Sequence, residues 1–151
     1  MNEQRAKVDE ATRREWRELG FYYEYDEKTR CWQLIGSRNG LLKFCDLLKR
    51  YSENQKNDTI SEHDHYGPYG YLEVMTWQVA QITDHAISGT LSDLERLSML
   101  CREKLNGAKP GSVVIIDKEY SPANTAKLQF AVREDNFDPA KADPLLSTGA
   151  G

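Results

Sequence analysis

The sequence predicts an α+β fold whose strands and helices follow the order ββα-ββα-ββ. Three observations predict it: short stretches of alternating apolar and polar residues joined by polar turns, two longer stretches with apolar residues at helical spacing, and a repeat that relates the two helical regions. Hairpins with short turns form antiparallel pairs, and two amphipathic helices must cover a sheet. We therefore expect a six-stranded, mostly antiparallel sheet with both helices packed on one face.

The repeat has an offset of 53 residues and needs no gap. At the end of a strand and the start of a helix it aligns Leu34 with Ile87, Gly36 with Gly89, and Ser37 with Thr90. Within the two helices it aligns Leu41 with Leu94, Phe44 with Leu97, and Leu47 with Leu100. Similar residue types over a strand, a turn and a helix indicate two copies of one structural unit.

The first unit begins with strands over residues 21–25 and 30–36, which flank a polar turn of hairpin length. Ser37 or Asn39 can cap the next helix by accepting an orphan backbone N–H. That helix is expected to run to about Tyr51. Its apolar residues recur with the spacing of a single core-facing stripe, at Leu41, Phe44, Cys45 and Leu48.

A polar surface loop over residues 52–62 separates the units. The second unit is expected to have strands over 71–77 and 81–88, joined by a turn at 78–80, and a helix over 91–105. Thr90 caps this helix, with Asp93 three residues on in an imperfect capping box. A last hairpin follows, with a continuously apolar strand at 113–116 and an alternating strand at 128–133.

The sequence predicts that the chain has three regions. Residues 1–19 are predicted as a charged arm or a short helix near 10–19, ended by Gly20 in the left-handed conformation that suits a helix C-terminus. Residues 20–135 form the single α+β domain, a size that folds without metal or disulfide. Residues 136–151 are predicted as an irregular tail, loose at 148–151, because Asp138-Pro139 and Asp143-Pro144 disfavour helix.

The net charge and the distribution of apolar residues indicate which partners and which cellular compartment to expect. The net charge of -4 and the pI near 5.4 argue against a nucleic-acid binder, which normally shows a basic face, and fit a basic protein partner better. The first 18 residues are charged throughout and lack the apolar region of a signal peptide, and no run is long enough for a membrane helix. We expect a cytoplasmic protein without membrane contact, whose three cysteines are small buried hydrophobes.

The sheet face opposite the helices is expected to carry Tyr23, Tyr25, Ile35 and Met75. These side chains are apolar for a face in water. A partner, a second copy in a homodimer or the terminal segments should therefore cover it.

The densest polar cluster is the segment from Ser61 to Tyr71. His63 and His65 point the same way in an extended segment and could supply two metal ligands, with a third from His85 or Asp84. The alternative functional hypothesis is therefore a small metal-binding enzyme or sensor that uses His63, His65 and His85. The interpretation we prefer is a solvated loop without metal or cofactor, because no established metal-binding motif is present.

No nucleophile signature supports catalysis. His85 lies beside Asp84, but the sequence has no G-x-S-x-G turn that would supply a nucleophilic serine. The helical cysteines Cys45 and Cys101 are expected to be buried and therefore inert. We expect no catalytic residues and no enzymatic activity.

The tyrosines indicate more about function than any other residue type here, because tyrosine is enriched at protein interfaces. The alternative is ordinary packing of alternating tyrosines on strands. On the interface interpretation, Tyr66 and Tyr69 are the apolar anchors of a partner-binding surface on the sheet and the loop over 62–71. The charged members of that surface are Asp26, Glu62, Asp64 and Asp84.

Most of the chain from Gly20 to Leu146 carries a family resemblance. The segments read FYYEYDEKTRCWQLIGSRNGLLKFCDLL, EHDHYGPYGYLEVMTW, ITDHAISGTLSDLERL and IDKEYSPANTAKLQFAVREDNFDPAKADPLL. In them the chain resembles a family of small bacterial cytoplasmic proteins associated with immunity to polymorphic toxins. The resemblance implies a non-enzymatic protein that binds and neutralises a cognate toxin. It assigns no toxin-contacting residues to these positions.

Overall fold

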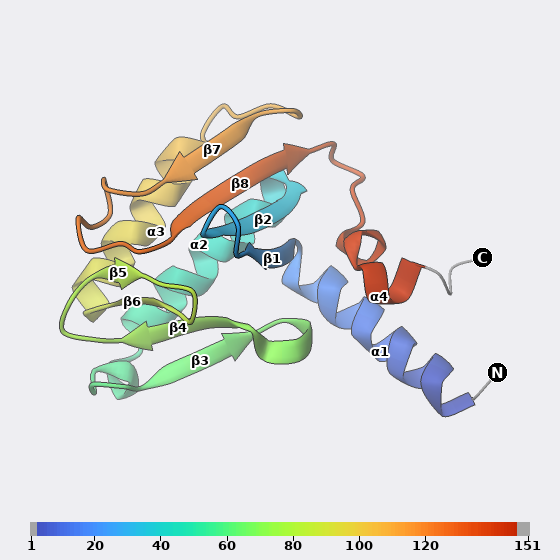
Figure 1. Ribbon diagram of the computed structural model, residues 1–151, viewed down its shortest axis with the longest axis horizontal. Coiled ribbons are helices and arrows are strands. Elements are labelled where there is room, and N and C mark those ends of the chain that lie inside the picture. The colour runs from blue at the N-terminus through green and yellow to red at the C-terminus, as the bar shows by residue number, and fades with distance from the viewer. Residues whose placement is uncertain (1–2, 148–151) are drawn as a thin grey trace.

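The computed structural model describes residues 3–147 and shows an α+β fold (Figure 1). The predicted class is confirmed. The predicted single six-stranded sheet is wrong, because the strands form two mixed four-stranded sheets. The predicted looseness of residues 148–151 lies outside the described residues.

The first sheet has the strand order β1-β2-β8-β7. Its strands are β1 (Tyr22–Asp26), β2 (Cys31–Ser37), β8 (Lys127–Arg133) and β7 (Val113–Ile116). The β1-β2 and β7-β8 pairs are the expected antiparallel hairpins, whereas β2 and β8 run parallel, with Leu34 opposite Phe130. A parallel pair at the centre of the sheet joins the last hairpin of the chain to the first.

The second sheet has the order β3-β4-β6-β5. Its strands are β3 (His63–Tyr66), β4 (Leu72–Thr76), β6 (Ile87–Gly89) and β5 (Gln81–Ile82). The expected strand over 81–88 is interrupted because the Thr83 hydroxyl accepts hydrogen bonds from the backbone N–H groups of His85 and Ala86, which closes a tight turn. Strand β5 therefore pairs with β6, and β4 pairs with β3 and runs parallel to β6.

The two sheets are built alike, because β1, β2, β8 and β7 correspond in order to β5, β6, β4 and β3. Each unit consists of a hairpin, a helix and a second hairpin, and the hairpin after each helix pairs with the central strand of the other unit. The predicted repeat therefore extends over a longer unit than the sequence pattern indicates, and the two copies exchange their last hairpins.

Helices α2 (Arg38–Glu53) and α3 (Leu91–Leu105) begin 53 residues apart, as 91 minus 38 gives. Ser37, one of the two predicted candidates, caps α2, where its Oγ accepts from Gly40 N at 3.0 Å. Thr90 caps α3 as predicted, and its Oγ1 accepts from Asp93 N at 3.1 Å. Where the helices pack together, Ser98 Oγ donates to the carbonyl oxygen of Cys45 at 2.7 Å. These two positions are themselves related by the offset of 53.

Figure 1 shows α2 and α3 side by side behind the strands, as predicted for two helices on one side. Helix α2 contacts β2 and β8, and α3 contacts β6 and β7, so both sheets rest on the helix pair. Phe44 of α2 packs against Phe130 of β8 with ring centroids 5.9 Å apart. All three cysteines are free and buried, as predicted.

The terminal segments pack against each other beside β1. Helix α1 (Glu3–Leu19) is longer than the helix expected there, and Gly20 follows it with a φ of 95°. Two short helices form the C-terminal segment, the 3-10 helix η3 (Pro139–Ala142) and α4 (Pro144–Ser147). Two further 3-10 helices, η1 (Gln55–Asn57) and η2 (Pro68–Gly70), lie before β3 and β4.

Of the four side chains predicted on the sheet face opposite the helices, two lie on the other face. Tyr23 and Tyr25 lie opposite Leu34 and Trp32 on β2, and directly paired residues share a face. Since Leu34 is a fully buried core residue, these tyrosines belong to the core-facing side. Ile35 lies on the opposite side, because side chains alternate along a strand.

Candidate functional site

A groove lined mainly by aromatic rings lies where α1, β1, η2 and the C-terminal segment meet. Its volume is about 310 Å³, at the lower end of the range for ligand pockets. The residues that line it are Trp16, Tyr22, Tyr23, Glu24, Tyr25, Trp32, Tyr69, Tyr71, Asp143, Pro144 and Leu145. Helix α1 and η2 run close together in this region (Figure 1).

The rings of the groove touch in a continuous series. Tyr71 and Tyr69 have centroids 6.2 Å apart, and Tyr69 lies edge-on to Trp16 at 6.2 Å. Trp16 contacts both Tyr22 and Tyr23, at 4.8 and 5.2 Å. Trp32 extends the series at the other end. Its ring centroid lies 6.4 Å from that of Tyr23 and 5.2 Å from that of Tyr25.

One end of the groove is open to solvent. The side chains of Tyr71 and Leu145 are 70% and 64% exposed, and Tyr69 is 47% exposed. Trp16 and Trp32, deeper in the groove, are almost fully buried. The groove therefore combines buried tryptophan rings with exposed apolar side chains.

Asp143 places a carboxylate in this aromatic wall. Its Oδ2 accepts hydrogen bonds from Trp16 Nε1 at 2.9 Å and from Tyr69 Oη at 2.6 Å, and its Oδ1 accepts from Leu145 N at 2.9 Å. Asp143 is 2% exposed, and these three donors satisfy its carboxylate oxygens. The carboxylate therefore adds negative potential to the groove.

Glu24 adds a second carboxylate beside Tyr22, whose hydroxyl lies 3.4 Å from Glu24 Oε2. Burial, followed by the charges of Glu24 and Asp143, raises the pKa of Tyr22 to about 12. At Tyr25 the groove adjoins a smaller polar hollow that includes Glu27, Arg30 and Asp84. Burial and then the charge of Asp84 raise the pKa of Tyr25 as well.

The backbone at Tyr69 is strained. This residue has a φ of 71° and a ψ of -17°, in the left-handed region that non-glycine residues adopt at an energetic cost. Gly67 and Gly70 on either side also have positive φ, which glycine tolerates. The hydrogen bond to Asp143 and the ring contact with Trp16 hold Tyr69 in place, and strain of this kind concentrates at functional sites.

The six predicted partner-binding residues lie in several parts of the structure. Tyr69 lines the groove, and Asp84 lines the neighbouring hollow. Asp26 ends β1, where its Oδ1 accepts from Lys28 N in the hairpin turn. The other three lie at or just before β3, away from the groove lining: Glu62, Asp64 and Tyr66.

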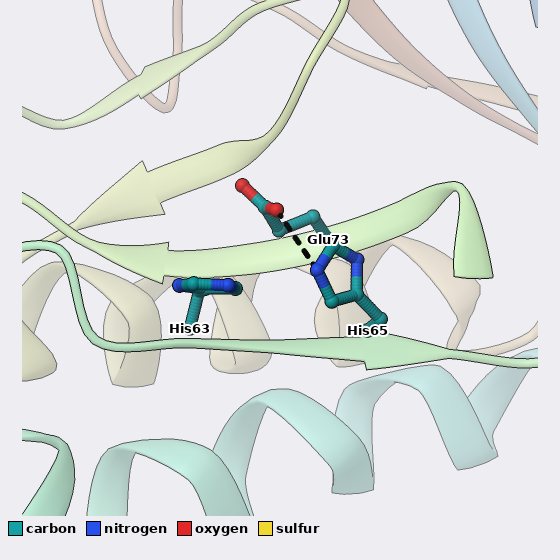
Figure 2. Close-up of side chains that lie close together, drawn as sticks. All are labelled: His63, His65 and Glu73. Carbon is teal, nitrogen blue, oxygen red and sulfur yellow. Dashed lines mark ion pairs between the residues drawn. The ribbon is translucent and has the colours of Figure 1, made fainter.

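Strand β3 brings together a second cluster, which Figure 2 shows: His63 and His65 from β3 and Glu73 from the neighbouring β4. One potential ligand atom from each side chain lies within 4.8 Å of the other two. His65 Nε2 is 3.3 Å from Glu73 Oε1, and the imidazole rings are 5.1 Å apart. Across the described residues 3–147, this is the one such group of three or more His, Cys, Asp or Glu side chains.

His85 does not join this cluster. It lies in the turn between β5 and β6 with its side chain 90% exposed, and its Nε2 is 3.7 Å from Asp84 Oδ1. Of the predicted trio, the structure brings together His63 and His65 and replaces the third member by Glu73. The cross-strand register explains the exchange, because Glu73 pairs directly with His65.

Several groove residues have no signal in the local sequence. Trp16 belongs to a segment with sparse apolar positions, and Asp143 and Leu145 belong to a segment predicted as an irregular tail. The isolated Trp16 in a charged helix is the one weak signal that could have indicated a packing site there, and none of the sequence-based predictions uses it.

Comparisons with protein-family models, with curated proteins and with solved structures find no match to this chain. Within residues 3–147, no helix has the length and apolar character needed to cross a membrane.

Proposed function

We propose that this protein is a non-enzymatic binding protein whose aromatic groove holds a basic segment of a partner protein. The observation that carries the proposal is the groove itself: a run of contacting rings with two carboxylates in or beside it and exposed apolar side chains at its open end. Tyrosine and tryptophan are the residues in which interface binding energy concentrates.

The chemistry of the lining favours a cationic side chain. The faces of Trp and Tyr rings attract Lys and Arg, and the carboxylates of Glu24 and Asp143 reinforce that attraction. The chain also carries a net charge of -4, so its field favours a basic partner over an acidic one. An Arg or Lys of the partner would then enter the groove, and Tyr71 and Leu145 would cover its aliphatic stem.

The biological role that we propose is immunity: the partner is a bacterial toxin encoded beside this protein, which neutralises it in the cytoplasm. This role follows from the resemblance of residues 20–146 to immunity proteins of polymorphic toxin systems. The groove supports the binding part of the proposal, and the family likeness supports the toxin part.

Co-expression with the protein encoded by the adjacent gene tests the role. Cells that express the candidate toxin should stop growing, and this protein should restore growth. A matched pair of variants separates the groove from the rest of the surface: Tyr71→Ala should lose protection, whereas Met99→Ala, a similarly exposed position on α3, should keep it.

Growth that stays arrested with the wild-type protein would argue against the immunity role. Equal protection by the two variants would argue against the groove. A second copy of this chain is the other occupant to test, and sedimentation of the purified protein across a range of concentrations would reveal a dimer.

A further inference from the structure

We propose that His63, His65 and Glu73 form a binding site for one divalent transition-metal ion of the zinc type. The inference is independent of the proposed partner-binding function, because none of the three side chains lines the aromatic groove.

Both imidazoles are held in the orientation that a metal site requires. His63 Nδ1 lies 2.9 Å from the carbonyl oxygen of Ser61, and His65 Nδ1 lies 2.8 Å from that of Gly70. A carbonyl can only accept, so each Nδ1 carries the hydrogen, and Nε2 of the neutral ring is left with its lone pair. Metal-binding histidines are fixed in this way by backbone carbonyls.

His65 and Glu73 are already in contact, because His65 Nε2 lies 3.3 Å from a carboxylate oxygen of Glu73. A proton on Nε2 or a metal ion bound to both atoms would stabilise this contact, and the zinc titration below separates the two.

The spacing of the ligands matches the size of the ion. Two ligand atoms, each about 2.1 Å from a tetrahedral ion, lie about 3.4 Å apart. The His65–Glu73 pair already has that spacing, at 3.3 Å. All three potential ligand atoms lie within 4.8 Å of one another.

Two paired strands position the three residues. His63 lies opposite Met75 and His65 lies opposite Glu73, so their side chains project from the same face of the β3-β4 ladder. Figure 2 shows the imidazoles on β3 beside the Glu73 carboxylate of β4. Two nitrogen ligands and one oxygen ligand suit zinc, and three protein ligands leave a fourth position for water or another ligand.

Zinc titration of tag-free, chelator-treated protein by calorimetry tests the site. The wild type should bind one Zn²⁺ per chain. The variants His65→Ala and Glu73→Gln should each weaken binding by at least about tenfold, since the loss of even an outer partner of a metal site costs 10–100-fold. His85→Ala is the matched control, because it removes an exposed histidine outside the cluster and should leave the affinity unchanged.

Three results would overturn the proposal: no saturable binding by the wild type, equal affinity of the wild type and both ligand variants, or an equal loss in His85→Ala. Far-UV circular dichroism of each variant excludes misfolding, which is not expected at these solvent-accessible positions. Co²⁺ provides a second readout, because a site with two nitrogen ligands and one oxygen ligand should give visible absorption bands that disappear in His65→Ala.

Discussion

Trp16 of α1 donates a hydrogen bond of 2.9 Å from Nε1 to the buried carboxylate of Asp143, 127 residues later in the chain. Trp16 is the one buried residue of α1, whose other residues are exposed or half-buried, and Asp143 lies between η3 and α4. This contact ties the two ends of the described chain together and forms the floor of the aromatic groove. The groove therefore depends on terminal segments that a truncated protein would lack.

Replacement of Trp16 by Phe tests that bond. The phenyl ring keeps much of the packing but removes the donor, which leaves the Asp143 carboxylate buried with one partner fewer. We expect a loss of about 1–3 kcal/mol in the free energy of unfolding, measured by urea denaturation. Val8→Ala on the exposed face of the same helix is the control, and a Trp16→Phe value as small as that of the control would contradict the account.

Replacement of Ser98 by Ala tests the contact between the two repeated units. The Ser98 hydroxyl is 2% exposed and donates to Cys45 O, so its removal should cost about 1 kcal/mol of unfolding free energy. Ser92→Ala, on the exposed side of α3, makes the same chemical change without that bond. Identical denaturation midpoints for the two variants would show that the bond contributes nothing.

Replacement of Arg30 by Gly should stabilise the protein. Arg30 has a φ of 52° in the turn between β1 and β2, a conformation that costs an ordinary residue about 1–2 kcal/mol. The greater entropy of glycine in the unfolded chain offsets about 0.5–1 kcal/mol of that gain. Lys28→Gly in the same turn lacks the positive φ and should destabilise the protein instead, so thermal melting should shift the two variants in opposite directions.

The ion pair between Arg17 and Asp138 should make stability depend on pH on the acid side. Arg17 Nη2 and Nε lie 3.0 and 3.2 Å from the Asp138 carboxylate, and this hydrogen bonding lowers the pKa of Asp138. A group with a lowered folded-state pKa stabilises the fold above its unfolded pKa, about 3.9, and loses that contribution as pH falls through the folded value.

Because the Arg17 side chain is half exposed, the contribution should be about 0.2–1 kcal/mol. Asp138→Asn keeps an acceptor for the backbone N–H of Ala140 and removes the charge. In urea denaturation the variant should be less stable than the wild type at pH 7, and the difference should be smaller at pH 3. A constant difference at both pH values would rule out the ion pair as its source.

Local patterns predicted the elements better than their pairing. The caps at Ser37 and Thr90 and the helices after them follow from short-range chemistry, which the sequence displays directly. The parallel pairing of β2 with β8 joins residues about 96 positions apart, and nothing in either strand encodes its partner. Strand β3 was missed because His63–Tyr66 is polar and forms the edge of its sheet.

The same distinction holds for the candidate sites. His63 and His65 were predicted as a pair because they are two residues apart on an extended segment, whereas Glu73 joins them only through the register of β3 and β4. Tyr69 was predicted as an anchor, but the groove around it needs Trp16 and Leu145 from opposite ends of the chain. Local spacing cannot bring such distant segments together.

The dissociation constant of the complex between this protein and the protein encoded by the adjacent gene tests the binding claim most directly. Tyr71→Ala and Leu145→Ala remove side chains that are 70% and 64% exposed at the groove, and Met99→Ala removes one that is 66% exposed on α3. We predict at least about tenfold weaker binding for both groove variants, equivalent to about 1.4 kcal/mol, and wild-type affinity for Met99→Ala. Wild-type affinity in both groove variants would contradict the assignment of the groove as the partner-binding site.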